Sequence, residues 1–210
     1  MQIPALLRRL PELVRLPQPL AETGGITVRL ARTDEELHAA QRLRYKVFAQ
    51  EYGARLSSAH NGLDVDMYDA YCDHLIAVEV ASDRVVGTYR MLTPKAAKRL
   101  GQRYISDEFL INRLESIESE LVEFGRSCVH PDFRSTTVLL TLWNGLAQYM
   151  RKNGFRYALG CSSTSLMDGG ANARTTWDVL RTTALAEETQ RVFPINRLQI
   201  EHFSPEGGNI

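Results

Sequence analysis

The sequence has no excess of charge of either sign. Lysine plus arginine and aspartate plus glutamate number 25 each, so the formal net charge at neutral pH is zero. A protein that binds the phosphate backbone of nucleic acid usually carries a basic excess. The charge balance therefore gives no support for nucleic acid as a partner.

Cysteine is scarce and long apolar runs are missing. Cys72, Cys128 and Cys161 are far apart, and no CxxC pair occurs. This odd, scattered set argues against a disulfide framework or a zinc site and fits a reducing compartment. No apolar run approaches the roughly 18 residues of a membrane span. We therefore expect a cytoplasmic protein without a bound metal.

The 210 residues, 44% hydrophobic and 24% charged, are sufficient for one globular domain with its own core. We expect an N-terminal amphipathic arm over residues 1–25 and a domain over residues 26–210. Residues 1–20 interleave leucines with arginines and lack a signal-peptide cleavage site. Peripheral contact with the cytoplasmic membrane face is one interpretation. The other is a helix packed on its own domain, or an arm broken by its four prolines.

Hydrophobic periodicity and turn residues predict alternating strands and helices, with no internal repeat. A capping box at Thr33–Glu36 opens the first helix. The order predicts an α/β protein with a mostly antiparallel front half and a βαβ back half. The expected strands are 26–31, 74–81, 85–92, 121–129, 155–161 and 196–203, and the expected helices are 34–52, 94–104, 137–153 and 175–187. The core face of the helix 137–153 is expected to consist of Leu139, Leu140, Leu142, Trp143, Leu146 and Met150.

The stretch LVEFGRSCVHPDFR, residues 121–134, is the most informative part of the sequence. Glu123 and Arg126 are three apart, so on a regular strand they would point to opposite faces. Gly125 between them predicts a β-bulge that re-aims the following side chains. A carboxylate and a guanidinium would then lie near one cleft. The alternative is an internal strand with one structural ion pair.

The segment 53–73 is expected to be a long polar loop with four aspartates, at positions 64, 66, 69 and 73. The loop lacks the glycine and the terminal glutamate that a calcium-binding loop has at fixed positions. Three roles fit these acids: metal binding, contact with a cationic substrate, or simple solvation.

Several of these residues occur in a combination that resembles a known family. The signature of bacterial acyl-homoserine-lactone synthases, which are GNAT-like acyltransferases that use acyl carrier protein, is matched by Arg44, Phe48, Asp66, Asp69, Arg90, Glu123 and Arg126. Four longer segments of the sequence more closely resemble those of the ornithine-lipid N-acyltransferases: RLRYKVF, YDAYCDHL, VVGTYRML and EFGRSCVHPDFR. Those enzymes make lyso-ornithine lipid from ornithine and a 3-hydroxyacyl carrier protein. The resemblance covers residues 26–161.

This resemblance implies a GNAT-like fold, with a mixed, mostly antiparallel twisted sheet, a bulged fourth strand and flanking helices. It also implies an acyltransferase of lipid biosynthesis. GNAT enzymes usually carry a glycine-rich loop for coenzyme A after that strand, whereas RSTTVLL at residues 134–140 has no glycine. We therefore expect acyl carrier protein as the acyl donor and no bound cofactor. Because the family continues past the last expected strand, a C-terminal part is expected to be absent.

Acyl transfer to an amine needs a group that takes up the proton of the amine. Glu123 is the candidate, as a base or as an anchor for the ammonium group. Arg90 and Arg126 would bind the amino-acid carboxylate or fix the acidic loop. Asp66 and Asp69 would hold Arg44 or a cationic side chain.

The acyl donor is expected to bind along the end of the same strand. Backbone N–H groups near Cys128 and Val129 would stabilise the oxyanion. The phosphopantetheine phosphate would lie at a helix N-terminus, near Arg134, Ser135 and Thr136. Cys128 as an acyl-cysteine nucleophile is a rival mechanism, although a strand cysteine is more often a small apolar core residue.

An acidic carrier protein requires a basic docking surface. Two basic stripes are candidates, namely Lys95, Lys98, Arg99 and Arg103, and then Arg151, Lys152 and Arg156. Two other functions stay open at this point: an acyl-homoserine-lactone synthase and a non-catalytic GNAT-like module that binds carrier protein. The sequence does not identify the amino acid that is acylated.

Overall fold

The computed structural model describes residues 19–56, 59–134 and 136–196. The chain divides into two compact units. Within the described residues, the first unit comprises 19–102 and 119–159, and the second comprises 103–118 and 160–196. Each unit is described by itself.

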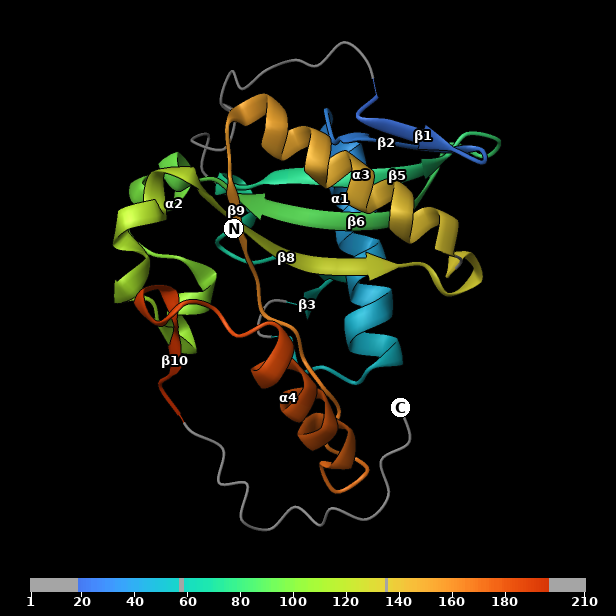
Figure 1. Cartoon of the computed structure of the whole chain (residues 1–210). Helices are drawn as coiled ribbons and strands as arrows, with labels where there is room; N and C mark the ends of the chain where they lie inside the picture. The colour runs from blue at the N-terminus through green and yellow to red at the C-terminus, as the bar shows by residue number, and fades with distance from the viewer. Residues whose placement is uncertain (1–18, 57–58, 135, 197–210) are drawn as a thin grey trace. The chain divides into compact units, whose positions relative to one another are not determined.

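The first unit is built on a six-stranded sheet in the order β1-β2-β5-β6-β8-β9. All neighbouring strands are antiparallel except β8 and β9, which are parallel and joined through a helix. This mixed, mostly antiparallel sheet with helices on its faces confirms the predicted fold class (Figure 1). The strands are β1 (Ala21–Thr23), β2 (Ile26–Leu30), β5 (Asp73–Glu79), β6 (Arg84–Leu92), β8 (Leu121–Val129) and β9 (Tyr157–Leu159). β1 lies within the segment that was predicted to be an arm.

Helices α1 (Asp34–Tyr45) and α3 (Thr136–Asn153) cover opposite faces of this sheet (Figure 1). Alternate residues of a strand point to opposite faces. Along β5, Leu75 and Ala77 belong to the core beneath α3, whereas Ile76 and Val78 pack against Ala40 of α1. The sheet is therefore buried on both sides.

The first helix begins as the capping box predicts. The hydroxyl of Thr33 accepts a hydrogen bond from the backbone N–H of Glu36 at 3.3 Å. The helix does not stay regular to about residue 52, because after Tyr45 it continues as a π-helical segment, η2 (Lys46–Glu51). Widened turns of this kind are rare and are often found at functional sites.

The core face of α3 differs from the prediction. The residues that are buried against the sheet are Val138, Thr141, Leu142, Gly145, Leu146 and Tyr149. Leu142 and Leu146 were predicted correctly, but Leu139, Leu140 and Trp143 are exposed. Gly145 sets the orientation of the helix, because its backbone lies close to β2. A Cβ on Gly145 would lie 2.5 Å from Cγ1 of Val28.

The segment predicted as a long loop contains a small hairpin of β3 (Ala59–His60) and β4 (Leu63–Asp64). Asn61 and Gly62 both have positive φ, as a two-residue hairpin turn requires. The other short elements of the first unit are η3 (Asp69–Tyr71), α2 (Pro94–Leu100) and η6 (Pro131–Phe133).

The second unit has little regular structure. Its two-stranded sheet pairs β7 (Phe109–Leu110) with β10 (Phe193–Pro194). α4 (Ala171–Thr183) begins earlier than predicted, and the short helices are η4 (Tyr104–Asp107), η5 (Asn112–Glu120, mostly in this unit) and η7 (Glu188–Gln190). All but the first residue of the predicted strand 196–203 lies outside the described residues.

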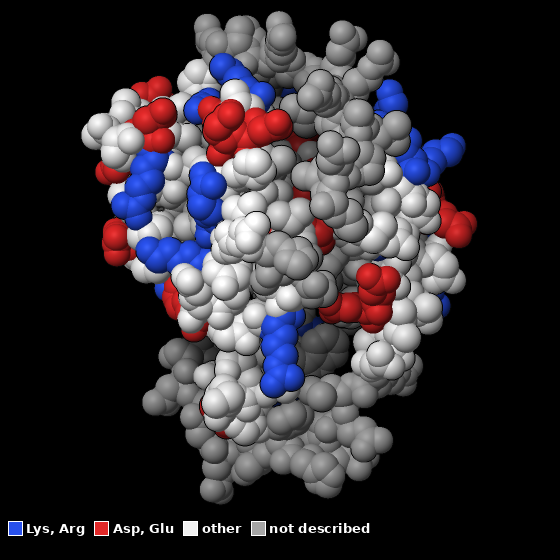
Figure 2. All heavy atoms as spheres, turned by 180° about the vertical axis from the view of Figure 1, so that it is seen from behind, with Lys and Arg blue, Asp and Glu red and all other residues white. Residues whose placement is uncertain are grey.

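Acidic and basic side chains are interspersed on the face shown in Figure 2, where neither sign forms one continuous patch. Among the helices of the described residues, none has the length and apolar character needed to cross a membrane. The arm predicted to contact the membrane lies almost wholly outside those residues.

Candidate functional site

Strand β8 carries the predicted bulge. Arg90 of β6 pairs with Gly125, but Thr88 pairs with Cys128, so two residues of β8 face one residue of β6. The extra residue is accommodated at Arg126, whose φ of 50° lies in the left-handed region. This conformation is uncommon for a residue with a side chain and turns the guanidinium out of the strand's regular alternation.

The acidic loop is held by Arg44 of α1, which is completely buried. Its Nη1 and Nη2 donate to the two carboxylate oxygens of Asp69 at 2.9 and 3.1 Å. Its Nε donates to Oδ2 of Asp64 at 2.8 Å, and Nη2 also donates to the backbone carbonyl of Asp64. A planar guanidinium therefore fixes two points of the loop at once.

Two further arginines complete the network. Arg90 Nη1 donates to Asp66 at 2.5 Å and to Asp69 at 2.9 Å. Arg126 donates from Nε to Asp64 at 3.0 Å and from Nη2 to Asp66 at 3.1 Å. Three guanidiniums thus meet three carboxylates, and the formal charges cancel. Both Arg90 and Arg126 contact the acidic loop, and their binding of an amino-acid carboxylate stays a prediction.

The network runs from the core to the surface. The side chain of Arg44 is 0% exposed and that of Asp69 is 5% exposed, whereas Asp66 is 14% and Arg126 is 19% exposed. Buried pairs of this kind need complete hydrogen bonding to offset the cost of desolvation. The accessible end, formed by Asp66 and Arg126, is where a small charged molecule can meet the network.

Electrostatics fix the charge state of the buried end. Burial by itself would raise the pKa of Asp69, but the guanidiniums of Arg44 and Arg90 hold that pKa far below its usual range. The same aspartate raises the pKa of Arg44 and Arg90 against the effect of burial. All three groups are therefore charged at neutral pH.

Glu123 lies in β8 three residues before Arg126 and is 4% exposed. It pairs with Leu92 of β6 on one side and with Leu159 of β9 on the other. This is the last pair between β8 and β9, so among the described residues β8 continues to Val129 without a partner strand on that side. Glu123 therefore lies where the sheet opens. That it shares a cleft with Arg126 stays a prediction.

Phe48 and Cys128 lie beside the network in a small apolar cluster with Leu43 and Val47. Burial raises the pKa of the Cys128 thiol to about 12. A thiol in this state is protonated at neutral pH and is a poor nucleophile. This favours the interpretation of Cys128 as a core residue.

The residues predicted to hold the donor phosphate are only partly described. Val129 is the last residue of β8, and Thr136 is the exposed first residue of α3. Arg134 forms a two-pronged ion pair with Glu51, at 2.5 and 2.6 Å. Ser135 lies outside the described residues. Their role in binding a phosphate stays a prediction.

Three members of the network were not predicted. Asp64 is brought in by the Asn61-Gly62 turn, a hairpin signal that the sequence does contain. Gln41 donates to Asp69 at 3.2 Å and lies one helical turn before Arg44. His74 contacts the backbone carbonyl of Asp69 through Nε2 at 3.0 Å, and nothing in its local sequence indicates this.

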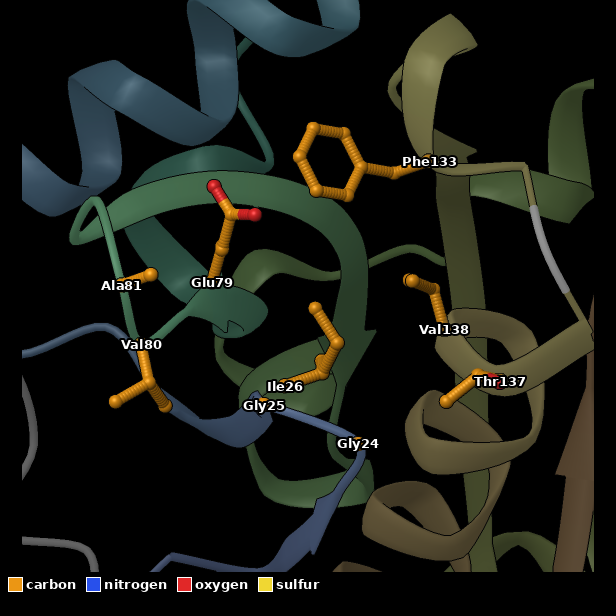
Figure 3. Close-up of a pocket in the computed structure, with 9 residues that line it drawn as sticks. All are labelled: Gly24, Gly25, Ile26, Glu79, Val80, Ala81, Phe133, Thr137 and Val138. Atoms are coloured by element: carbon orange, nitrogen blue, oxygen red, sulfur yellow. The ribbon is translucent and has the colours of Figure 1, made fainter.

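A hollow lies elsewhere in the first unit. It has a volume of about 570 Å³ and is lined by Gly24, Gly25, Ile26, Glu79, Val80, Ala81, Phe133, Thr137 and Val138 (Figure 3). None of the predicted catalytic or substrate-binding residues lines it. Among the described residues, no group of three or more histidine, cysteine or acidic side chains is arranged to hold a metal ion.

Known proteins share the fold and part of the sequence of this chain. Residues 43–144, which include most of the network and β8, match the family described as Acetyltransferase (GNAT) domain. This match agrees with the predicted GNAT-like fold. A solved acyl-homoserine lactone synthase, BjaI, described as dependent on coenzyme A, superposes with a TM-score of 0.50 at 21% identity, covering 67% of this chain and 65% of BjaI. At that identity the likeness shows the fold alone.

The predicted resemblance to ornithine-lipid enzymes is confirmed by sequence. An L-ornithine N(alpha)-acyltransferase from Rhodobacter capsulatus is 38% identical over 143 residues, or 65% of this chain and 55% of that protein. The corresponding protein from Rhizobium meliloti is 37% identical over 153 residues, or 69% of this chain and 52% of that protein. The chain thus spans about half the length of the curated relatives it matches.

Proposed function

We propose that this chain transfers a 3-hydroxyacyl group from acyl carrier protein to the α-amine of ornithine, giving lyso-ornithine lipid. The observation that carries the proposal is the accessible end of the charge network, where Asp66 and Arg126 are presented together next to the bulge of β8. An amino acid has an ammonium and a carboxylate group. A carboxylate and a guanidinium side by side are their complementary partners. The sequence identity to two named ornithine acyltransferases supports ornithine as the acceptor.

In the proposed reaction the uncharged amine attacks the thioester carbonyl carbon. A C–N bond forms, the C–S bond breaks, and the donor leaves as its thiolate. Glu123 takes up the proton of the amine directly or through one water molecule. Its position in β8 next to the point where β9 ends brings a buried carboxylate close to the opening of the sheet.

The donor is proposed to lie between Gly125 and Val129, along the side of β8 where no described strand follows the last pair with β9. Pantetheine contains amide groups, and an extended amide chain adds to a free strand edge through backbone hydrogen bonds. The thioester would then be near Glu123. The absence of glycine from residues 134–140 supports a carrier-protein donor over coenzyme A.

The docking surface for the carrier protein is also a proposal. On α2, Lys95, Lys98 and Arg99 are exposed and suit an acidic partner. Arg103, which was predicted to belong to the same stripe, is 4% exposed and is therefore removed from it. The exposed Arg151 and Lys152 at the end of α3 form a second candidate surface.

The test is to incubate the purified protein with 3-hydroxyacyl carrier protein and a panel of amino acids, and to identify acylated amines by mass spectrometry. We expect acyl-ornithine, with loss of product in Glu123→Ala and Arg126→Ala. A lactone from S-adenosylmethionine would replace the proposal with signal synthesis. Carrier-protein binding without any product would identify a non-catalytic module.

A further inference from the structure

Helix α3 has a second apolar face, which the described residues leave exposed. Leu139, Leu140 and Trp143 are 38%, 56% and 55% exposed, and the exposed Ala147 follows Trp143 one helical turn later. We call these four residues the outer stripe. The opposite face of the helix is buried against the sheet. A helix that is apolar on both sides is usually covered on both sides.

The outer stripe carries no charge. Residues 136–150 contain neither an acidic nor a basic side chain, and the charged residues of α3 begin with Arg151. The indole Nε1–H of Trp143 donates to the hydroxyl of Tyr89 at 3.2 Å, so the polar atom of the ring already has a partner. A partner that binds chiefly through charge finds nothing complementary on this surface. The stripe instead suits apolar side chains.

The chain itself brings an apolar segment to this helix. Leu20 and Ala21 belong to the same core cluster as Leu142 and Leu146 of α3, and β1 packs against the helix (Figure 1). The backbone N–H of Leu20 donates to the carbonyl of Val28 at 2.8 Å, so this residue is fixed to the sheet. Residues 1–18, which lie outside the described part of the chain, are therefore attached beside α3.

The sequence of residues 1–18 supplies matching side chains. Leu6, Leu10 and Leu13 are three and four positions apart, with Leu7 and Val14 next to them. This spacing is typical of a single apolar side, and the three arginines of the segment fall outside it. Prolines at positions 4, 11 and 17 keep any helix in this sequence too short to be stable in water by itself. The apolar side therefore requires a surface to pack on.

We propose that the apolar side of residues 1–18 covers the outer stripe of α3 within the same molecule. The contact removes two apolar surfaces from water at once and leaves the arginines of the segment facing solvent. Because the segment is joined to the core at Leu20, its effective concentration at the helix is on the order of millimolar. This favours the contact over one with a separate molecule. Of the two interpretations of the N-terminal residues, it selects packing on the domain.

The fluorescence of Trp143 tests the contact. Trp177 is the second tryptophan of the sequence, so Trp177→Phe in the whole chain leaves Trp143 as the single emitter. In this background, Leu10→Asp should raise the acrylamide quenching constant about threefold, because a carboxylate on the apolar side cannot be buried without a partner. Gln2→Asp adds the same side chain outside the apolar side and should leave quenching unchanged. Equal quenching in all three proteins overturns the proposal.

Limited trypsin digestion tests the contact from the side of the helix. Trypsin cleaves after arginine, and the segment offers Arg9 and Arg15. In Leu140→Asp, cleavage at both sites should be about fivefold faster than in the parent, since the segment is released from the stripe. Leu180→Asp is the control, at a leucine of α4 that is 48% exposed. Equal cleavage rates in Leu140→Asp and the control, with unchanged melting temperatures, overturn the proposal.

Two further outcomes would assign the stripe to a different partner. Quenching of Trp143 that falls as the protein concentration rises, together with a larger species in sedimentation, would assign it to a second copy of the chain. Protection of Trp143 only on adding vesicles of phosphatidylcholine and phosphatidylglycerol would assign it to a lipid surface. Either outcome overturns the proposal. None of these measurements uses acyl transfer, so their results are independent of the proposed function.

Discussion

Arg44 and Asp69 form a two-pronged ion pair in which both side chains are almost fully enclosed, with 0% and 5% of their surfaces exposed. Arg44 belongs to the helix beneath the sheet, and Asp69 belongs to the loop that leads into β5. The pair therefore connects the interior of the domain to the loop that carries Asp66. The enclosed pair thus holds in place a loop whose accessible end, at Asp66, is the proposed contact for the substrate.

Removal of the Asp69 charge should destabilise the protein. In Asp69→Asn, Arg44 and Arg90 lose a buried counter-charge, which in comparable buried pairs costs about 3–5 kcal/mol. We expect this loss in urea denaturation. Asp132→Asn, at an exposed position, is the control and should change the free energy of unfolding by less than about 0.5 kcal/mol. Equal midpoints for parent and Asp69→Asn would show that the pair adds nothing to stability.

Because of the same aspartate, the free energy of unfolding should fall as the solution becomes acidic. Its pKa is lowered in the folded protein, so the stabilisation is complete above the unfolded pKa of about 4 and is lost as the pH falls toward the folded value. The unfolding free energies of the parent and Asp69→Asn should therefore converge as the pH is lowered from 5 to 3. Urea titrations at several pH values measure the difference. If the difference in unfolding free energy between the parent and Asp69→Asn stayed constant from pH 5 to pH 3, the lowered pKa of Asp69 would be contradicted.

The sequence predicted the bulge of β8 but only part of the site. The bulge was predictable because Gly125 separates two charged residues that a regular strand would place on opposite faces. Asp64 was not selected from among the aspartates of its loop, because spacing alone does not show which carboxylates turn inward. That choice is made by contact with Arg44 and Arg126, which are 20 and 62 residues away in the chain.

Glu123→Gln should separate the two roles considered for this carboxylate. If Glu123 accepts the proton of the amine, kcat should fall about 10²–10⁴-fold and the acid limb of the pH–rate profile should disappear. If it only anchors the ammonium group, the KM for ornithine should rise with little change in kcat. Glu120→Gln, at a half-buried glutamate next to the start of β8, serves as the control. Parental kinetics in Glu123→Gln would exclude both roles.

Cys128→Ala should retain acyl transfer. Because burial raises the pKa of this thiol to about 12, very little thiolate exists at neutral pH, and thiolate is the reactive form. We expect kcat within about threefold of the parent, with a loss of stability of about 1 kcal/mol from the cavity. Mass spectrometry of the parent after mixing with donor alone is the second measurement. An acyl adduct on Cys128, absent from the variant, would restore the acyl-cysteine mechanism.

The orientation of α3 was predicted only in part, for a physical reason. Its apolar residues extend around more than one face, so periodicity does not indicate which side is buried. The deciding contact is a backbone approach at a glycine, where no side chain contributes to the hydrophobic pattern. Leu139, Leu140 and Trp143 were placed in the core for this reason and lie at the surface.

A pair of glycine substitutions tests that contact. In Gly145→Ala the new methyl group would lie 2.5 Å from Val28 and 3.5 Å from Leu75, so helix and strand must separate. Overpacking of this kind costs about 1–3 kcal/mol, which exceeds the gain in helix propensity of about 1 kcal/mol. In Gly125→Ala the new Cβ meets no atom within 4 Å, and the φ of this residue is not positive. We therefore expect a lower melting temperature for Gly145→Ala alone. Equal melting temperatures would mean that α3 is not in close contact with β2 at this position.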